Sequence, residues 1–306
     1  MQQATVQRWY NVLKSLPNCQ YFHFYKDRKA ATEDNKVTEP LTLGDAITIF
    51  LTFCVQLERP IKGSHILNLG TYSADEALEV PDLRGLSMAP VQLPGFKKTL
   101  STVEDMTIGH KSVTASSVPS VDFDFSLLWH ALQLKELRIN FEAGNGGADM
   151  IARLAATAPD HPFSLEILYI EDTLGIRGQD LQAILSRHRS TLQKLIFCFV
   201  TMNEGDWEDT LLFMAENTFP QLQGVTFFHI SEGSPADAYF LEFPGLEGSA
   251  ALVDKETGSS IIGKGAGVWD GPHRPVHAEY HGPKVNVADR KLASAAAIFS
   301  PYLDDL

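Results

Sequence analysis

Cysteine is scarce in this chain of 306 residues, which contains only Cys19, Cys54 and Cys198. All three lie in apolar surroundings and are far apart in the sequence. An odd, scattered set lacks the spacing of a disulfide framework or of a zinc-binding motif. We therefore expect a reducing, intracellular setting, either cytoplasmic or nuclear.

Positive charge is also in short supply. The 25 Lys and Arg residues are outnumbered by 38 Asp and Glu residues, which gives a net charge of −13. Nucleic acids and anionic membranes both attract proteins through a basic surface. Neither is expected as a partner.

Long apolar segments are missing as well. The longest apolar run covers residues 46–57, whereas a helix needs about 20 apolar residues to span a bilayer. The first residues, MQQATVQRWY, lack the charged start and the apolar core of a secretory signal. The sequence predicts neither a membrane span nor secretion.

Familiar catalytic motifs do not occur. There is no G-x-S-x-G, and the phosphate-loop-like GSSIIGKG (258–265) has Gly265 where a magnesium-binding hydroxyl is needed. Cys198 lies within the apolar IFCFV, which favours a small buried or groove residue over a nucleophile. Asp122 and Asp124 in VDFDF suit a turn or the edge of a strand. We expect no enzyme and no cofactor.

A repeated apolar pattern is what the sequence does contain. The pattern L-x-x-L-x-(apolar) begins at Val103, Leu134, Leu165, Leu192 and Leu222, in steps of about 30 residues. Two weaker copies begin at Cys19 and Ser64. Between the copies, one-sided apolar patterns predict helices over 5–16, 42–57, 147–158, 179–188 and 204–216. Thr42 and Asp45 have the spacing of a helix-capping box.

One helix and one short strand cannot bury both of their apolar sides alone, whereas stacked copies can. The predicted fold class is therefore α/β. We expect a leucine-rich-repeat-like solenoid over residues 1–230, with a parallel sheet on the concave side and helices on the convex side. The alternative is a compact doubly wound α/β domain, which does not require the same apolar register in each strand.

The segment LSRHRSTLQKLIFCFVTMNEGDWEDTLLFMAENTFPQLQGVTF (185–227) supports a resemblance. Its HR-x-T-L helix end and E-x-D-W helix start resemble the repeat region of fungal F-box proteins with irregular leucine-rich repeats. That resemblance implies a substrate receptor or scaffold in ubiquitin ligation, with ubiquitin-ligase components as partners. The F-box itself is not visible, because the early Leu16-Pro17 is followed by a strand-like NCQYFHF. The family's adaptor-binding role is therefore not carried over, and none of its site residues maps onto this chain.

The repeat stops near residue 231. The remaining 231–306 is predicted to be an irregular cap or insertion, with a hairpin over 250–263 and a terminal helix over 287–299. A small separate functional module is the alternative.

Side chains that alternate with the buried strand positions would point into the concave groove. Tyr, Arg and Phe are the residue types that anchor interfaces, so we expect this face to bind a protein partner. The alternative is a solvated surface without a ligand. The predicted partner-binding residues are Tyr21, His23, Arg138, Asn140, Tyr169, Glu171, Lys194 and Phe228.

A second functional hypothesis comes from HRPVHAEYHG (273–282). A strand over 276–280 would place His277, Glu279 and His281 on one face. Two imidazoles and a carboxylate can ligate a metal, which would make the chain a metal-dependent enzyme with its site in the C-terminal module. An exposed polar strand face would give the same alternation.

Overall fold

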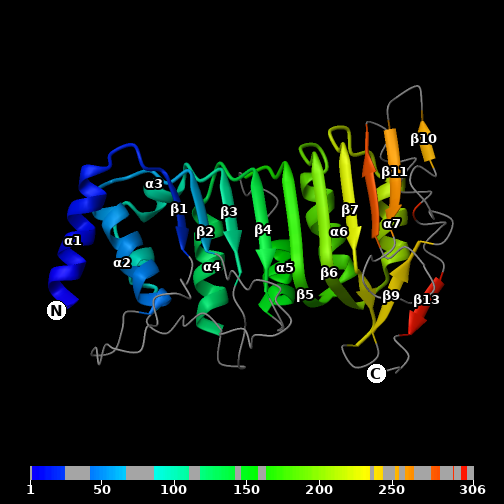
Figure 1. Cartoon of the computed structure of the whole chain (residues 1–306), viewed down its shortest axis with the longest axis horizontal. Coiled ribbons are helices and arrows are strands. Elements are labelled where there is room, and N and C mark those ends of the chain that lie inside the picture. The colour runs from blue at the N-terminus through cyan, green and yellow to red at the C-terminus, as the bar shows by residue number, and fades with distance from the viewer. Residues whose placement is uncertain are drawn as a thin grey trace. The chain divides into compact units, whose positions relative to one another are not determined.

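The structure is a computed structural model. It describes residues 2–24, 42–66, 86–109, 118–141, 146–157, 163–234, 238–243, 252–254, 259–264, 277–282, 292 and 298–301. The chain divides into two compact units, Met1–Lys135 and Glu136–Leu306. In each unit helices alternate along the chain with parallel strands, so the predicted α/β class is confirmed (Figure 1).

The first unit contains three parallel strands, β1 (Tyr21–Phe24), β2 (Gly63–Ile66) and β3 (Asp105–Ile108). Its helices are α1 (Gln2–Ser15), α2 (Leu43–Gln56), α3 (Phe96–Leu100), α4 (Val118–His130) and the 3-10 turn η2 (Ala89–Gln92). The strand β1 packs on α2 through Phe22 and Phe50, whose ring centroids are 4.3 Å apart.

Helix α2 begins at the capping box that the sequence predicts. The Thr42 hydroxyl accepts a hydrogen bond from the Asp45 amide at 3.0 Å, and the Asp45 carboxylate accepts one from the Thr42 amide at 3.0 Å. These two bonds satisfy amides that have no partner inside the helix.

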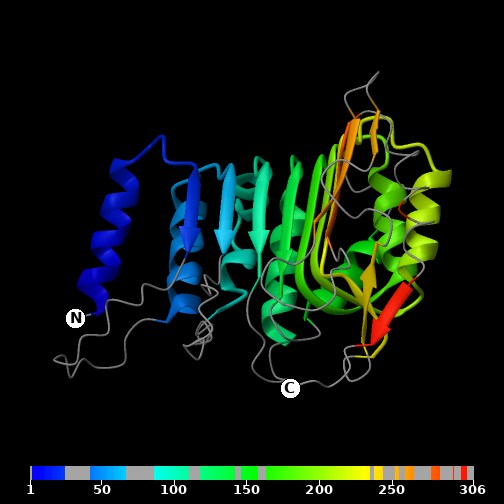
Figure 2. The same cartoon turned by 45° about the vertical axis from the view of Figure 1, so that its right-hand side comes forward.

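The second unit is built on β4 (Glu136–Asn140), β5 (Ile167–Arg177), β6 (Lys194–Glu204) and β7 (Gly224–Phe228), all parallel. Helices α5 (Gly146–Ala156), α6 (Gly178–His188) and α7 (Trp207–Glu216) connect them and lie on one side of the sheet (Figure 2). Beyond β7 the strands are antiparallel: β12 (His277–His281) pairs with β7, β11 (Ser259–Lys264) with β12, and β10 (Leu252–Asp254) with β11. The short β8 (Ser231–Glu232) pairs with β6 and with β9 (Tyr239–Glu242), which also pairs with β13 (Ile298–Pro301).

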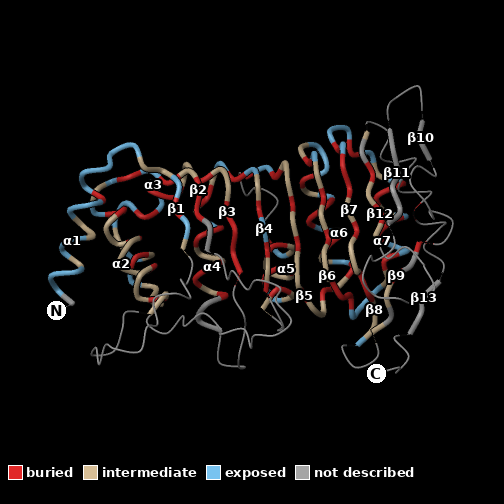
Figure 3. The backbone as a smooth tube through the Cα atoms, viewed as in Figure 1, coloured by how far each residue is buried: buried red, intermediate tan, exposed pale blue. Residues whose placement is uncertain are grey.

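The repeated apolar positions form the core on the helix side of this sheet. Strand pairing places Leu137, Leu168, Leu195 and Val225 in one row, and each has no exposed surface. Figure 3 shows buried and partly exposed positions alternating along these strands. Burial of each Leu side chain stabilises the fold by roughly 1.5–3 kcal/mol. The apolar pattern therefore recurs in the sequence at the positions that this row requires.

A kink that the sequence does not predict follows the paired part of three strands. Asp172, Phe199 and His229 have φ of 48°, 52° and 49°, and each stands one residue beyond the paired positions Glu171, Cys198 and Phe228. After the kink the strands pair again, as in Thr173 with Val200 and Thr201 with Ser231. The left-handed conformation costs about 1–2 kcal/mol for each of these residues. The strand hydrogen bonds on both sides of the kink offset this cost.

Two predictions of local structure are wrong. Asp122 and Asp124 lie in helix α4, not in a turn or at a strand edge. Their apolar neighbours in this helix, including Val121 and Phe123, are buried, which favours the helix over an exposed turn. Residues 298 and 299, assigned above to a terminal helix, belong to β13. Their sequence is compatible with either a helix or a strand, and the hydrogen bonds to β9 favour the strand. Apart from Leu292, which is helical, residues 287–297 lie outside the described part of the chain.

The hairpin predicted over 250–263 is confirmed, because Leu252 pairs with Ile261 in antiparallel strands. Together with β12, this hairpin extends the sheet of β4–β7. Within the described residues, no helix is both long and apolar enough to cross a membrane.

Candidate functional site

One side of the second unit's sheet faces away from the core. Its middle row contains Arg138, Tyr169, Ile196, Thr226 and Glu279, which strand pairing places side by side. The next row contains Asn140, Glu171, Cys198, Phe228 and His277. We call these two rows, with Glu136 and Lys194 beside them, the polar face.

Arg138 is held in place by its neighbours on the polar face. Its Nε and Nη2 donate to Glu136 Oε1 at 3.0 and 2.8 Å, and its guanidinium carbon lies 5.4 Å from the centre of the Tyr169 ring. The Arg138 side chain keeps half of its surface exposed. A guanidinium fixed over an aromatic ring is ready for contact without much loss of side-chain entropy.

Tyr169, Glu171 and Cys198 form a hydrogen-bonded group beside it. Asn140 Nδ2 donates to Glu171 Oε2 at 3.2 Å, and the Tyr169 side chain is hydrogen-bonded to Glu171 and Cys198. Burial raises the pKa of Tyr169, and the Cys198 and Glu171 side chains raise it further. This arrangement keeps the phenol neutral and oriented.

Burial also raises the pKa of the Cys198 thiol to about 11, although the Tyr169 hydrogen bond lowers it. The thiol is therefore protonated near neutral pH, which makes it a poor nucleophile. This agrees with the sequence-based interpretation of Cys198 as a small buried or groove residue rather than a nucleophile.

Aromatic rings gather at the other end of the polar face. Phe228 meets the rings of His229, Phe199 and His277 edge-on at 4.4, 5.2 and 5.3 Å, and Phe199 stacks on His229 at 5.1 Å. Burial lowers the pKa of His229, and His277 contributes to the same shift. The sequence analysis missed Phe199 and His229, because their inclusion depends on the kink.

The predicted partner-binding residues fall into two groups. Arg138, Asn140, Tyr169, Glu171, Lys194 and Phe228 belong to the second unit and share the polar face. Tyr21 and His23 belong to the first unit, on β1, where both are exposed. The Tyr21 ring lies against Gly63, where a side-chain carbon would come within 2.4 Å of it.

The predicted metal-binding residues are in β12, as the sequence suggests. Ala278 and Tyr280 are buried, whereas His277 and Glu279 lie on the polar face with 4.0 Å between His277 Nε2 and Glu279 Oε2. No group of three or more His, Cys, Asp or Glu side chains that could hold a metal occurs among the described residues. The His281 side chain is outside the described part, so this metal site stays a prediction.

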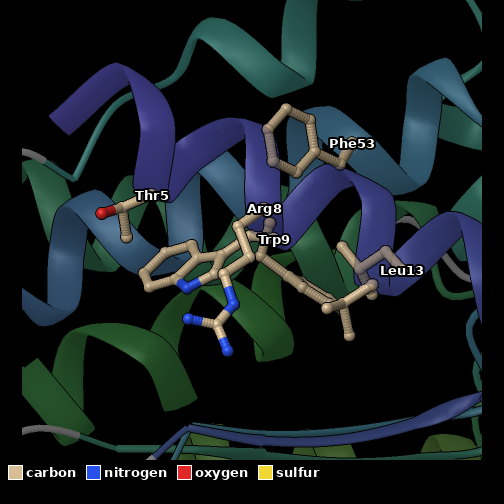
Figure 4. Close-up of a pocket in the computed structure, with 7 residues that line it drawn as sticks. Thr5, Arg8, Trp9, Leu13 and Phe53 are labelled. Carbon is tan, nitrogen blue, oxygen red and sulfur yellow. The ribbon is translucent and has the colours of Figure 1, made fainter. Parts of the chain in front are cut away.

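A groove in the first unit is a second candidate site that the sequence analysis did not identify. It lies between α1 and α2, has a volume of about 430 Å³, and is drawn in Figure 4. The sequence holds one indication of this groove: Val12 is an apolar residue on the otherwise polar side of α1. Its lining residues are Thr5, Arg8, Trp9, Val12, Leu13, Phe50 and Phe53.

Comparisons of the chain with protein-family models, with curated proteins and with solved structures find no match. The polar face and the groove are therefore the features from which a function is inferred.

Proposed function

We propose that the chain is a non-enzymatic protein-interaction module that binds a protein partner on the polar face. In the arrangement we propose, the repeats form a leucine-rich-repeat-like solenoid and the polar face is on its concave side. The observation that carries this proposal is the contact between Arg138 and the Tyr169 ring, supported from one side by Glu136.

Three properties of this group favour a partner protein. Tyr and Arg are the side chains most often found at the energetic centre of interfaces. Both are oriented by neighbours in the unbound chain, which reduces the entropy lost on binding. The aromatic Phe228 lies in the adjoining row, so apolar and polar contacts are available together.

The proposed role is that of an intracellular substrate receptor or scaffold, with ubiquitin-ligase components among its partners. Support for this finer statement comes from the resemblance of 185–227 to the repeats of fungal F-box proteins. Its test is the recovery of ligase subunits when the chain is captured from its native cell.

The binding surface is tested by removing the central group. We expect Arg138→Ala, Tyr169→Ala and Glu171→Ala together to abolish capture of the partner, since interface anchors of this kind contribute roughly 2 kcal/mol or more each. The matched control combines Arg189→Ala, Glu208→Ala and Glu216→Ala, which are exposed positions at the end of α6 and on α7. Equal capture by both triple variants and the natural chain would contradict the proposal.

The rival metal-dependent activity has a separate test. Protein purified without a histidine tag is analysed for zinc, iron and manganese, before and after His277→Ala. Our proposal expects no stoichiometric metal in either protein. A bound metal that disappears with His277→Ala would favour the enzyme instead.

A further inference from the structure

The groove between α1 and α2 is lined mainly by apolar side chains and by one positively charged residue, whereas the chain as a whole is acidic. Its walls are the aromatic and aliphatic side chains of Trp9, Val12, Leu13, Phe50 and Phe53. On its far side α1 is fixed to α2 through Tyr10 and Phe53, whose rings meet edge-on at 5.2 Å. The groove therefore has two rigid walls, each a regular helix.

The apolar surface continues beyond the groove along α1. Val12, which lines the groove, is 48% exposed, and Leu16, directly after the last helical residue Ser15, is 47% exposed. From Thr5 to its end at Ser15, α1 extends for about 15 Å at the helical rise of 1.5 Å per residue. A small molecule would fill only the groove, whereas an amphipathic helix laid along α1 would also cover Leu16.

A positive side chain, that of Arg8, lines the groove, although the net charge of the chain is −13. Among the described residues, Arg8 is the only charged one that lines the groove, and none of them forms an ion pair with it. Helix α1 contains no Asp or Glu, and the only acid of α2, Asp45, accepts both Thr42 hydrogen bonds in the capping box. A carboxylate would therefore be attracted to the groove and would meet no acidic side chain from α1.

We propose that this groove binds an acidic amphipathic helix of a partner protein, with apolar side chains between α1 and α2 and a carboxylate against Arg8. The site belongs to the first unit and is independent of the function proposed for the polar face.

The test selects helical peptides from a display library against the full chain. The library keeps one apolar stripe at i, i+4 spacing and randomises the flanking positions. We expect Asp or Glu to be enriched at one flanking position. A synthetic copy of the selected peptide is then titrated by fluorescence polarisation.

Charge reversal decides whether Arg8 is the contact. With Arg8→Glu, the selected peptide should bind about tenfold or more weakly, and the same peptide with Lys in place of its acid should recover affinity. Val12→Glu should abolish binding of both peptides. Lys14→Glu is the matched control, since Lys14 is on the same helix and does not line the groove. Circular dichroism and thermal unfolding show that each variant is folded.

Four results would overturn the proposal. The first is selection without any acid preference, and the second is affinity that Arg8→Glu leaves unchanged. The third is a self-associating chain whose dimer dissociates with Val12→Glu, because the occupant would then be a second copy. The fourth is binding to phosphatidylserine vesicles that Arg8→Glu removes, with no peptide selected, because the ligand would then be a lipid surface.

Discussion

Arg187 Nη1, near the end of α6, donates to the Leu154 carbonyl oxygen in α5 at 2.6 Å. Its Nη2 donates to the carbonyls of Ala155 and Thr157 at 2.9 and 2.6 Å. One side chain therefore bonds three carbonyls at the end of the preceding repeat's helix, where the helix leaves carbonyls without its own hydrogen bonds; that of Leu154 also accepts from the Thr157 amide. It connects two repeats by bonds that are stronger than neutral ones.

We expect Arg187→Ala to lower the free energy of unfolding by about 2–4 kcal/mol, since three charged hydrogen bonds to backbone carbonyls are lost. Urea unfolding measures this change. Arg187→Lys should retain part of the stability, and Arg189→Ala, at an exposed neighbouring position, is the control. If Arg187→Ala lowered the free energy of unfolding no more than Arg189→Ala, the three hydrogen bonds of Arg187 would not contribute to stability.

The left-handed kink makes a prediction at Asp172, whose φ is 48°. A β-branched residue fits this backbone poorly, whereas Asn adopts it readily. We expect Asp172→Val to destabilise the chain by about 1–2 kcal/mol and Asp172→Asn to be nearly neutral. The comparison uses the midpoints of chemical unfolding. Equal stability of the two variants would show that the kink relaxes without cost.

His229 gives a prediction about pH. Burial lowers its pKa below the ordinary value of 6.5, with a contribution from His277, so the unfolded chain binds the proton more readily than the folded chain. Its stabilising contribution is therefore present above about pH 6.5 and is lost as the pH falls through the folded pKa.

We expect the natural chain to lose stability on acidification below about pH 6.5 more steeply than His229→Phe, which keeps an aromatic ring but cannot titrate. Glu232, whose pKa is raised chiefly by burial, has the opposite sign, but it is present in both proteins and cancels in their difference. Thermal unfolding at several pH values measures the slopes. Parallel slopes would exclude His229 as the source.

Cys198 gives a prediction about reactivity. A thiol with a pKa of about 11 has roughly 100-fold less thiolate at neutral pH than one near 9. We expect Cys198 to be alkylated by iodoacetamide about 100-fold more slowly than a free thiol, in a background with Cys19→Ala and Cys54→Ala. Tyr169→Phe should slow it further, because the hydrogen bond that stabilises the thiolate is removed. Labelling at the rate of free cysteine would contradict the buried environment.

The sequence predicts the strands β1–β7 and most of the helices because the apolar register recurs. Leu137, Leu168 and Leu195 fill equivalent places, so a simple alternation also identifies Arg138 and Tyr169 as neighbours on the opposite face. The same reasoning places His277 and Glu279 on one side of β12. These inferences need only the strand period of two and burial of one side.

Other features depend on contacts between distant segments. Asp172, Phe199 and His229 are an acid, a hydrocarbon ring and an imidazole, so a backbone conformation common to all three cannot be inferred from their side chains. The groove depends on how α1 rests against α2, which fixes whether Val12 is covered or exposed. The strand at 298–301 forms because β9 offers it hydrogen bonds. The local sequence pattern predicts none of these three features.

The antiparallel pairing of β12 with β7 has a practical consequence for anyone shortening the protein. A chain that stops near residue 230, where the repeats end, would lose His277 and Glu279 from the polar face and would leave the backbone of β7 without its partner on that side. Bare strand edges of this kind pair with other molecules and promote aggregation. Failure of such a fragment to capture a partner would therefore not separate lost solubility from lost recognition.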